Sequence, residues 1–100
     1  MGKLYVVTRN DLPIAYQAVQ AGHAVAEWML NNESHPWRNN ILVYLTVPDA
    51  EMLEMLVLKL RSRAHRFSVF REPDLNNEQT ALACYTESNF FDKLKMMGTV

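Results

Sequence analysis

The chain has 100 residues, of which 49% are hydrophobic and 21% are charged, with a formal net charge of −1. This length predicts one domain with a modest core, and the composition is that of a soluble globular protein. The absence of a basic excess makes a long nucleic acid an unlikely partner, although a pocket for one nucleotide needs only a few donors.

A single cysteine, Cys84, excludes an intrachain disulfide and a cysteine-based metal site. The histidines His23, His35 and His65 lack the spacing of metal ligands, so we expect neither a metal nor a cofactor. The sequence enters a strand-like run at once and contains no apolar run of membrane-spanning length. We therefore expect a cytoplasmic protein with no membrane partner.

The first half of the chain reads as strand, helix, strand. A β-branched and aromatic run predicts a buried strand over Lys3–Thr8, and the polar turn after it places Asp11 as a helix cap. Helical periodicity then extends from Ile14 to about Leu30, and Ile41–Val47 forms a second strand. The helix stripe expected to face the sheet, with its glycine allowing close approach, is Ala15, Ala18, Gly22, Val25 and Met29.

The second half begins with a helix capped by Asp49, and strands follow at Arg66–Arg71 and Thr80–Tyr85. A polar loop, 72–79, joins those strands, and Ser88 caps a last helix over Asn89–Met97. The order β-α-β-α-β-β-α predicts a small α/β sandwich whose first crossovers create parallel strands. The core stripe of the second helix is Leu53, Leu56, Val57 and Leu60.

Two groups of polar residues stand out. Tyr16, Gln20, His23 and Glu27 fall within about 60° of helical arc, nearly opposite the alanine-rich stripe. They form either a face for a ligand or a second subunit, or a solvated helix face. Arg9 and the residue after it lie where a strand ends and a helix begins, a position that suits phosphate binding.

The loop over 72–79 is longer than a hairpin requires, which favours a functional role over a plain connection. Arg71 could pair with a phosphate, and the amides of Asn76, Asn77 and Gln79 suit base edges. Trp37 could stack on a base, although a loop tryptophan more often packs against its own domain.

Four segments together resemble the type II peptidyl-tRNA hydrolase fold family. They are "YVVTRNDL", the helix with "QAVQAGHA", "VPDAEMLEML" and "FSVFREPDL", and they cover nearly the whole chain. The resemblance implies a three-layer α/β/α sandwich around a four-stranded mixed sheet, with the last strand antiparallel between the first and third.

The chain departs from the hydrolases where their chemistry resides. No lysine occurs between Lys3 and Lys59, whereas the enzymes carry an essential lysine in the turn after the "RNDL"-like motif. The second loop is shorter, and its aspartate position falls on Glu72 or Asp74. The sequence looks most like short bacteriophage relatives, a branch of which sequesters cyclic di- or trinucleotides of the CBASS immune system without cleaving them.

The resemblance therefore implies a non-catalytic, cytoplasmic sponge for a signal such as cyclic GMP-AMP in an infected bacterium. The alternative is a divergent peptidyl-tRNA hydrolase that uses Asp11, His23, Glu72 and Asp74. The residues expected to bind the ligand are Arg9, Asn10, Tyr16, Gln20, His23, Arg71, Glu72, Asp74, Asn76, Gln79 and Thr80.

The sequence also predicts self-association into a dimer or tetramer, because it holds more apolar side chains than one small core can bury. The alternative is that the last helix covers the second one. The residues behind this prediction are Met52, Met55, Leu58, Phe90, Phe91, Met96 and Met97.

Overall fold

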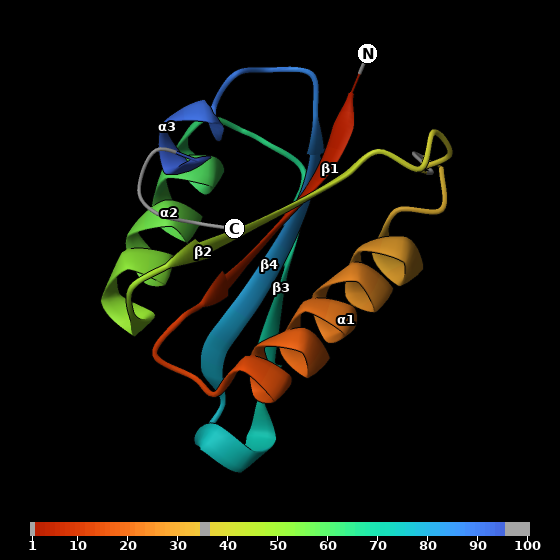
Figure 1. Ribbon diagram of the computed structural model, residues 1–100. Helices are drawn as coiled ribbons and strands as arrows, with labels where there is room; N and C mark the ends of the chain where they lie inside the picture. Colours follow the sequence, from red (N-terminus) through yellow and green to blue (C-terminus); the bar gives the residue numbers. More distant parts are fainter. Residues whose placement is uncertain (1, 35–36, 96–100) are drawn as a thin grey trace.

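The computed structural model describes residues 2–34 and 37–95, apart from the side chains of residues 93 and 95. Strands and helices alternate through the first two-thirds of the chain, and a hairpin and a short helix follow (Figure 1). The elements are β1 (Lys3–Arg9), α1 (Ile14–Asn31), β2 (Leu42–Val47), α2 (Ala50–Ser62), β3 (Phe67–Glu72), the 3₁₀ turn η1 (Pro73–Leu75), β4 (Glu78–Thr86) and α3 (Asp92–Lys95).

The four strands form one mixed sheet in the order β2-β1-β4-β3. β1 and β2 are parallel, and β4 runs antiparallel to both of its neighbours, β1 and β3. The expected four-stranded mixed sheet is therefore confirmed. Helix α1 covers one face of the sheet, and α2 lies on the other (Figure 1).

Each face of the sheet has its own apolar cluster because side chains alternate along a strand. On β4, Leu82 and Cys84 belong to the cluster beneath α2, whereas Ala81 and Ala83 belong to the cluster beneath α1. The small alanines leave room for Trp28 of α1, which is 1% exposed. Burial raises the pKa of the Cys84 thiol to about 12.

Helix α2 matches its prediction in both its cap and its buried face. The Asp49 carboxylate accepts a hydrogen bond from the N–H of Met52 at 2.9 Å, which satisfies one of the free donors of the first turn. The expected stripe is the set of buried residues that α2 contributes to the core: Leu53, Leu56, Val57 and Leu60.

Helix α1 has a different buried face from the one that the sequence predicts. The stripe Ala15, Ala18, Gly22, Val25 and Met29 is not its buried face. A Cβ added at Gly22 would meet nothing within 4 Å, so close approach to the sheet does not explain this glycine. The true buried residues lie roughly a third of a turn away, and they are Gln17, Gln20, Ala21, Ala24 and Trp28.

The loop and helix near the end of the chain are shorter than expected. Because β3 extends to Glu72 and β4 begins at Glu78, these two residues pair and leave five residues between them. Helix α3 begins at Asp92 rather than at Asn89. The side chain of Ser88 still accepts a hydrogen bond, from the N–H of Phe90.

Phe91, one of the residues behind the predicted self-association, is fully buried and stacks on Tyr5 with ring centroids 4.7 Å apart. It therefore belongs to the core. Met96 and Met97 lie outside the described residues. In the part of the chain that the structure describes, no helix has both the length and the apolar character needed to cross a membrane.

Candidate functional site

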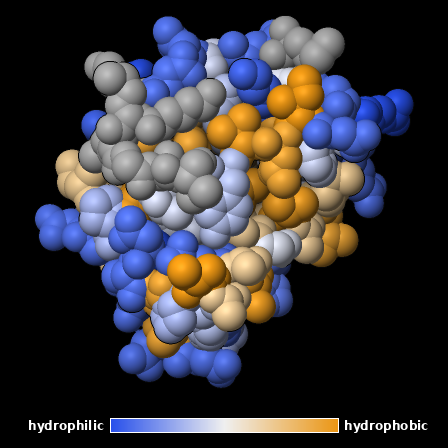
Figure 2. All heavy atoms as spheres, in the orientation of Figure 1, coloured by the Kyte–Doolittle hydropathy of each residue, from blue (hydrophilic) through white to orange (hydrophobic). Residues whose placement is uncertain are grey.

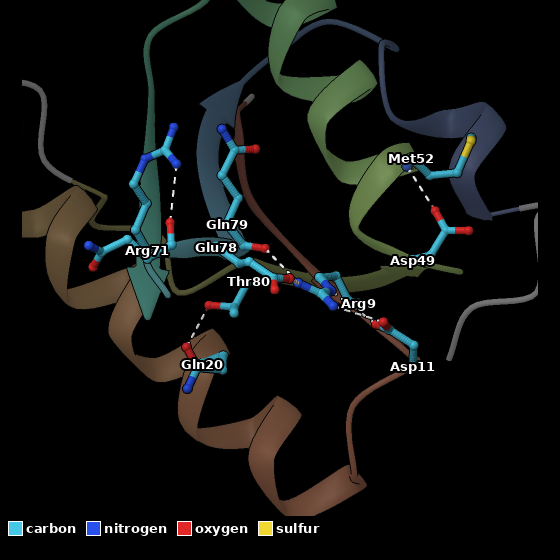
Figure 3. Close-up of polar contacts among 10 residues, drawn as sticks. Arg9, Asp11, Gln20, Asp49, Met52, Arg71, Glu78, Gln79 and Thr80 are labelled. Carbon is cyan, nitrogen blue, oxygen red and sulfur yellow. Dashed lines mark hydrogen bonds and ion pairs between the residues drawn. The ribbon is translucent and has the colours of Figure 1, made fainter. Parts of the chain in front are cut away.

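A β-bulge near the end of the sheet places Thr80. Phe70 pairs with Ala81, but Arg71 pairs with Gln79, so Thr80 is an extra residue on β4. Strict alternation would put Thr80 on the α2 face together with Leu82. The bulge turns its side chain instead toward α1, where it meets a polar residue of that helix (Figure 3).

A chain of buried hydrogen bonds starts at this threonine. The Thr80 hydroxyl donates to Oε1 of Gln20 at 2.5 Å, and Nε2 of Gln20 donates to Oε1 of Glu72 at 2.8 Å. The N–H of Asp74 donates to the other oxygen of Glu72 at 3.2 Å. Gln20 and Thr80 are fully buried, and Glu72 is 9% exposed.

These contacts hold Glu72 in its ionised form. The hydrogen bond from Gln20 lowers the pKa of the Glu72 carboxyl, and the N–H of Asp74 lowers it further. The Gln20 amide uses its oxygen and its nitrogen in this chain, and its two partners come from the two strands of one hairpin. This chain of hydrogen bonds therefore holds α1 against the β3–β4 turn.

Three aromatic rings, those of His23, Phe70 and Tyr16, lie beside this chain of hydrogen bonds on the α1 face. The His23 ring is exposed and lies flat on Phe70, with ring centroids 4.2 Å apart and an interplanar angle of 5°. Partial desolvation, together with the carboxylates of Glu72 and Asp74, raises the pKa of Tyr16. These polar and aromatic side chains are the part of the predicted site that the structure brings together.

Arg9 is the centre of a second group. The alternation of β1, in which Tyr5 and Val7 face α2, puts Arg9 on the α2 side of the sheet. Its guanidinium donates twice to Asp11 (Nε–Oδ1 3.0 Å and Nη2–Oδ2 2.8 Å) and once to Glu78 (Nη1–Oε1 2.8 Å; Figure 3).

A fourth hydrogen bond runs from Nη1 of Arg9 to the carbonyl of Gln79, at 3.2 Å. Four of the five N–H donors of the guanidinium are therefore occupied. The side chain is buried at 6% exposure and is neutralised by two carboxylates. The hydrogen bond from Arg9 also lowers the pKa of Asp11.

The expectation that Asp11 caps α1 is wrong, because Arg9 binds its carboxylate instead. The N-cap residue of α1 is Pro13, and no side chain caps the helix. The first N–H groups of α1 thus lack the side-chain acceptor that α2 has in Asp49. Asn10 is exposed, and its backbone N–H donates to the Val47 carbonyl at 2.8 Å.

Arg71 and Gln79 extend from the sheet away from α1 (Figure 3). Nη1 of Arg71 donates to the carbonyl of Asn77 at 3.2 Å. Oε1 of Gln79 is buried and has no hydrogen-bond partner among the described residues. Asn76 and Asn77 adopt left-handed backbone conformations (φ 54° and 60°), which asparagine tolerates better than most residues.

The expected ligand residues therefore form two groups on opposite faces of the sheet. Gln20, His23 and Glu72 lie on the α1 face, while Arg9 and Arg71 lie on the α2 face. One small ligand at a single face could contact only one of these groups directly.

Trp37 packs against its own domain. It is partly buried against the α1-side cluster, and its ring nitrogen donates to the Ile41 carbonyl at 3.0 Å. His35, its neighbour in the sequence motif, lies outside the described residues. Glu27, the last member of the helical polar stripe, accepts a hydrogen bond from Asn31 at 3.3 Å.

Two open hollows lie away from the predicted ligand residues. One, of about 520 Å³, is lined by Asn31, Asn32, Arg61, His65, Arg66, Phe67, Ser68 and Val69. The other, of about 530 Å³, is lined by Val47, Met52, Met55, Leu56, Lys59, Arg63, Asn89, Phe90, Asp92 and Leu94.

Sequence reasoning did not select the residues of the first hollow. The signal was the run Lys59–Arg71, which contains five lysines and arginines and no carboxylate. Within the described residues, no group of three histidine, cysteine or acidic side chains could hold a metal ion.

The fold and these contacts define a small α/β domain with a mixed four-stranded sheet and a polar cluster at one end of it. No family model matches the chain, and no curated protein matches it. Among solved structures, the chain is similar to Atu0240, a protein of unknown function from Agrobacterium tumefaciens strain C58. The two are 15% identical, with a TM-score of 0.70 over 99% of this chain and 96% of that one, which is a likeness of fold alone.

Proposed function

We propose that the protein binds and sequesters a cyclic oligonucleotide without cleaving it, in the cytoplasm of a phage-infected bacterium. The ligand class comes from the sequence resemblance to short phage relatives of the type II peptidyl-tRNA hydrolases. The observation that supports a non-catalytic protein is the state of Asp11 and Glu72, two of the three acidic residues that a hydrolase would use.

A general base near neutral pH works best when its pKa lies close to the working pH. The pKa values of Asp11 and Glu72 are both lowered, by hydrogen bonds from Arg9 and Gln20 respectively. Both carboxylates are thereby made weaker bases. The turn after β1 also carries no lysine, since none occurs between Lys3 and Lys59.

The α1 face offers contacts that suit a nucleotide. The outer face of the exposed His23 ring, backed by Phe70, is a stacking platform for a base. The carboxylate of Asp74 can accept hydrogen bonds from the N–H donors of a guanine edge. The first N–H groups of α1, which no side chain caps, can donate to a phosphate.

The direct test measures binding and cleavage together. Purified protein is mixed with cyclic di- and trinucleotides, the thermal shift is recorded, and the protein is then heat-denatured to release the ligand. A thermal shift followed by recovery of intact ligand supports the proposal. No shift with any cyclic oligonucleotide, combined with turnover of a peptidyl-tRNA, identifies a hydrolase instead.

Two substitutions locate the site. We expect His23→Ala to remove the stacking platform and Asp74→Asn to weaken the guanine contact, each reducing affinity by about tenfold. Glu54→Gln, on the exposed side of α2, changes the charge by the same amount as Asp74→Asn and should leave affinity unchanged. If both site variants bind like the wild type, the ligand occupies another surface.

We also propose that the protein is a homodimer in which a second copy covers the outer face of α1. Apart from His23 and Asn31, every exposed position of that helix holds an apolar residue or glycine. Small residues on this face permit the close approach of a second helix. The residues proposed for the contact are Ile14, Ala15, Ala18, Val19, Gly22, Ala26, Met29 and Leu30, while His23, at the border of this face, stays free to stack on a base.

A further inference from the structure

The first hollow runs around the free edge of the sheet. Its lining includes Asn31 and Asn32, at the C-terminal end of α1 on one face, and Arg61 and His65, at the end of α2 on the other. Because α1 and α2 lie on opposite faces (Figure 1) and Phe67, Ser68 and Val69 also line the hollow, it passes over the strand that holds these three residues. That strand is β3, which is the last in the sheet order.

The outer side of β3 has unpaired backbone groups. Residues Phe67–Arg71 pair with β4 on one side, and no other backbone hydrogen bond reaches them within the described part of the chain. Such an edge is a template on which an extended peptide can add as a further strand. Phe67 and Val69, which are half-buried, would lie beside that strand.

The hollow is positively charged. Arg61 and Arg66 are exposed, and neither forms an ion pair with a described residue. None of the described residues that line the hollow carries a carboxylate. The guanidinium of Arg61 lies 5.9 Å from the centroid of the Phe67 ring, and Nη1 of Arg66 donates to Oδ1 of Asn32 at 3.4 Å. The two cations are thus positioned at the edge rather than extended into solvent.

The negative ends of the helix dipoles offset only part of this positive charge. The C-terminal ends of α1 and α2 each carry about half a negative charge, which makes about one negative charge in total. Arg61 and Arg66 bring two positive charges. The edge therefore keeps a net positive charge after both helix ends are compensated.

We propose that β3 receives an extended acidic peptide of a partner protein as a fifth strand, with its carboxylates on Arg61 and Arg66. Backbone pairing would supply the affinity and the arginines the preference for acidic sequences. A single nucleic-acid strand is less favoured, because the basic residues follow a backbone edge with unpaired strand groups, which a peptide can pair with and a nucleic acid cannot. The inference is independent of nucleotide binding on the α1 face.

The test uses a fluorescent seven-residue peptide of alternating valine and glutamate, measured by anisotropy against the full-length protein. We expect binding of this peptide and none of its valine–lysine counterpart. A version N-methylated at alternate backbone nitrogens keeps the charge but loses the strand hydrogen bonds, so it should bind at least about tenfold more weakly. In an ¹⁵N spectrum, the amide signals of Phe67–Phe70 should shift on binding.

Charge reversals separate the edge from the charge of the whole molecule. Arg61→Glu and Arg66→Glu should each weaken binding of the acidic peptide about tenfold. Lys59→Glu, which changes the charge equally at a residue that lines the other hollow, should change it less than twofold. Circular dichroism checks that each variant is folded, and the thermal shift with cyclic nucleotides should be the same in all three.

Three results would overturn the proposal. One is equal binding of the N-methylated peptide, which would exclude strand addition. Another is tighter binding of an oligothymidylate of the same charge, which would identify the edge as a nucleic-acid site. The third is unchanged peptide binding with increased aggregation of Arg66→Glu, which would assign the arginines to protecting a bare edge from self-pairing.

Discussion

At the scale of single residues, Gln20 is the most constrained side chain of the polar cluster. Its oxygen accepts from Thr80 and its nitrogen donates to Glu72, and all three side chains are buried. A glutamine without charge can bridge a hydroxyl and a carboxylate because its amide both accepts and donates. The amide therefore satisfies two groups that would otherwise be buried without a partner.

We expect Gln20→Ala to lower the free energy of unfolding by about 2–4 kcal/mol, since Thr80 and Glu72 each lose a buried hydrogen bond. Urea denaturation at pH 7 measures the change. Glu54→Ala, at an exposed site of α2, should stay within about 0.5 kcal/mol of the wild type. A similarly small change for Gln20→Ala would mean that water replaces the amide without loss.

The pKa of Glu72 is lowered in the folded protein. A carboxyl of this kind stabilises the fold fully above its unfolded pKa, near pH 4.5, and the stabilisation is lost as the pH falls through the folded value. We therefore expect Glu72→Gln to be less stable than the wild type at pH 7. The difference should shrink progressively when urea unfolding is repeated below about pH 4.5.

A constant difference between pH 7 and pH 3 would contradict this assignment, because it would show that the charge of Glu72 contributes nothing. Glu54→Gln is the control for replacing an exposed glutamate in the same way.

The role of Gln20 was only half visible in the sequence. Its position on a polar helical stripe with His23 was predicted, and a solvent- or ligand-facing role followed from that stripe. The residues that bury it are 52 and 60 positions away in the chain. A buried glutamine depends on partners that only the folded chain brings close, so periodicity within one helix could not identify it.

At the scale of elements, α1 has two apolar faces, and periodicity alone could not say which one meets the sheet. The alanine-rich stripe has the pattern of a buried face because all five of its residues are small or apolar. Trp28 decides the matter, because it buries a much larger apolar surface than any of the alanines. The glutamines beside it are tolerated in the interface because they find hydrogen-bond partners, Gln17 with the Leu12 carbonyl and Gln20 with Glu72.

The face of α1 that is left exposed leads to a prediction about assembly. If a second copy covers it, Ala18→Glu should place a charge in the interface and convert the dimer to a monomer. Sedimentation velocity at micromolar concentration measures this directly. Leu58→Glu, which adds the same charge at an exposed apolar residue of α2 (62% exposed), should leave the dimer intact.

If the wild-type protein sediments as a monomer over this concentration range, the proposed dimer is wrong, whatever the variants do.

The backbone at the end of α2 is strained at one residue, and a substitution there can relieve the strain. Ala64 has a left-handed backbone (φ 56°), and the N–H groups of Ala64 and His65 donate to the carbonyls of Arg61 and Leu60, at 3.1 and 3.0 Å. This is the Schellman arrangement, in which glycine is the preferred residue. We expect Ala64→Gly to raise the free energy of unfolding by about 0.5–1 kcal/mol, measured by urea denaturation.

Ala50→Gly, at the first residue of the same helix, is the matched control, because glycine is unfavourable there and should lower stability. A loss of stability at Ala64 as well would show that the left-handed turn is not strained.

At the scale of the whole molecule, the alternation of strands and helices was readable from the sequence, and so was the mixed sheet. The arrangement of the site was not. A bulge is set by the pairing of β3 with β4, and this one moves Thr80 to the face opposite the one that alternation gives it. Thr80 and its neighbour Ala81 thereby serve the same face of the sheet, the α1 face, while Gln79 points to the other side (Figure 3).

The molecule also shows how charge and apolar surface are distributed around this sheet. Blue hydrophilic residues and orange apolar residues occupy separate areas of the face seen in Figure 2. The carboxylates of Asp11, Glu72 and Glu78 lie at the end of the sheet near the start of α1, while Arg61 and Arg66 lie at the opposite end of β3. A net charge of −1 therefore describes neither end.

Because Cys84 is buried, labelling of its thiol can measure transient opening of the folded protein. The thiol is fully buried in the core beneath α2, so a thiol reagent can reach it only when that side of the core opens. In the limit of fast reclosing, the labelling rate of the native protein divided by that of a short cysteine peptide equals the fraction of open molecules. We expect this ratio to give, without denaturant, the same free energy as urea unfolding, whereas labelling at a much higher rate would reveal a partial opening that lifts α2 from the sheet.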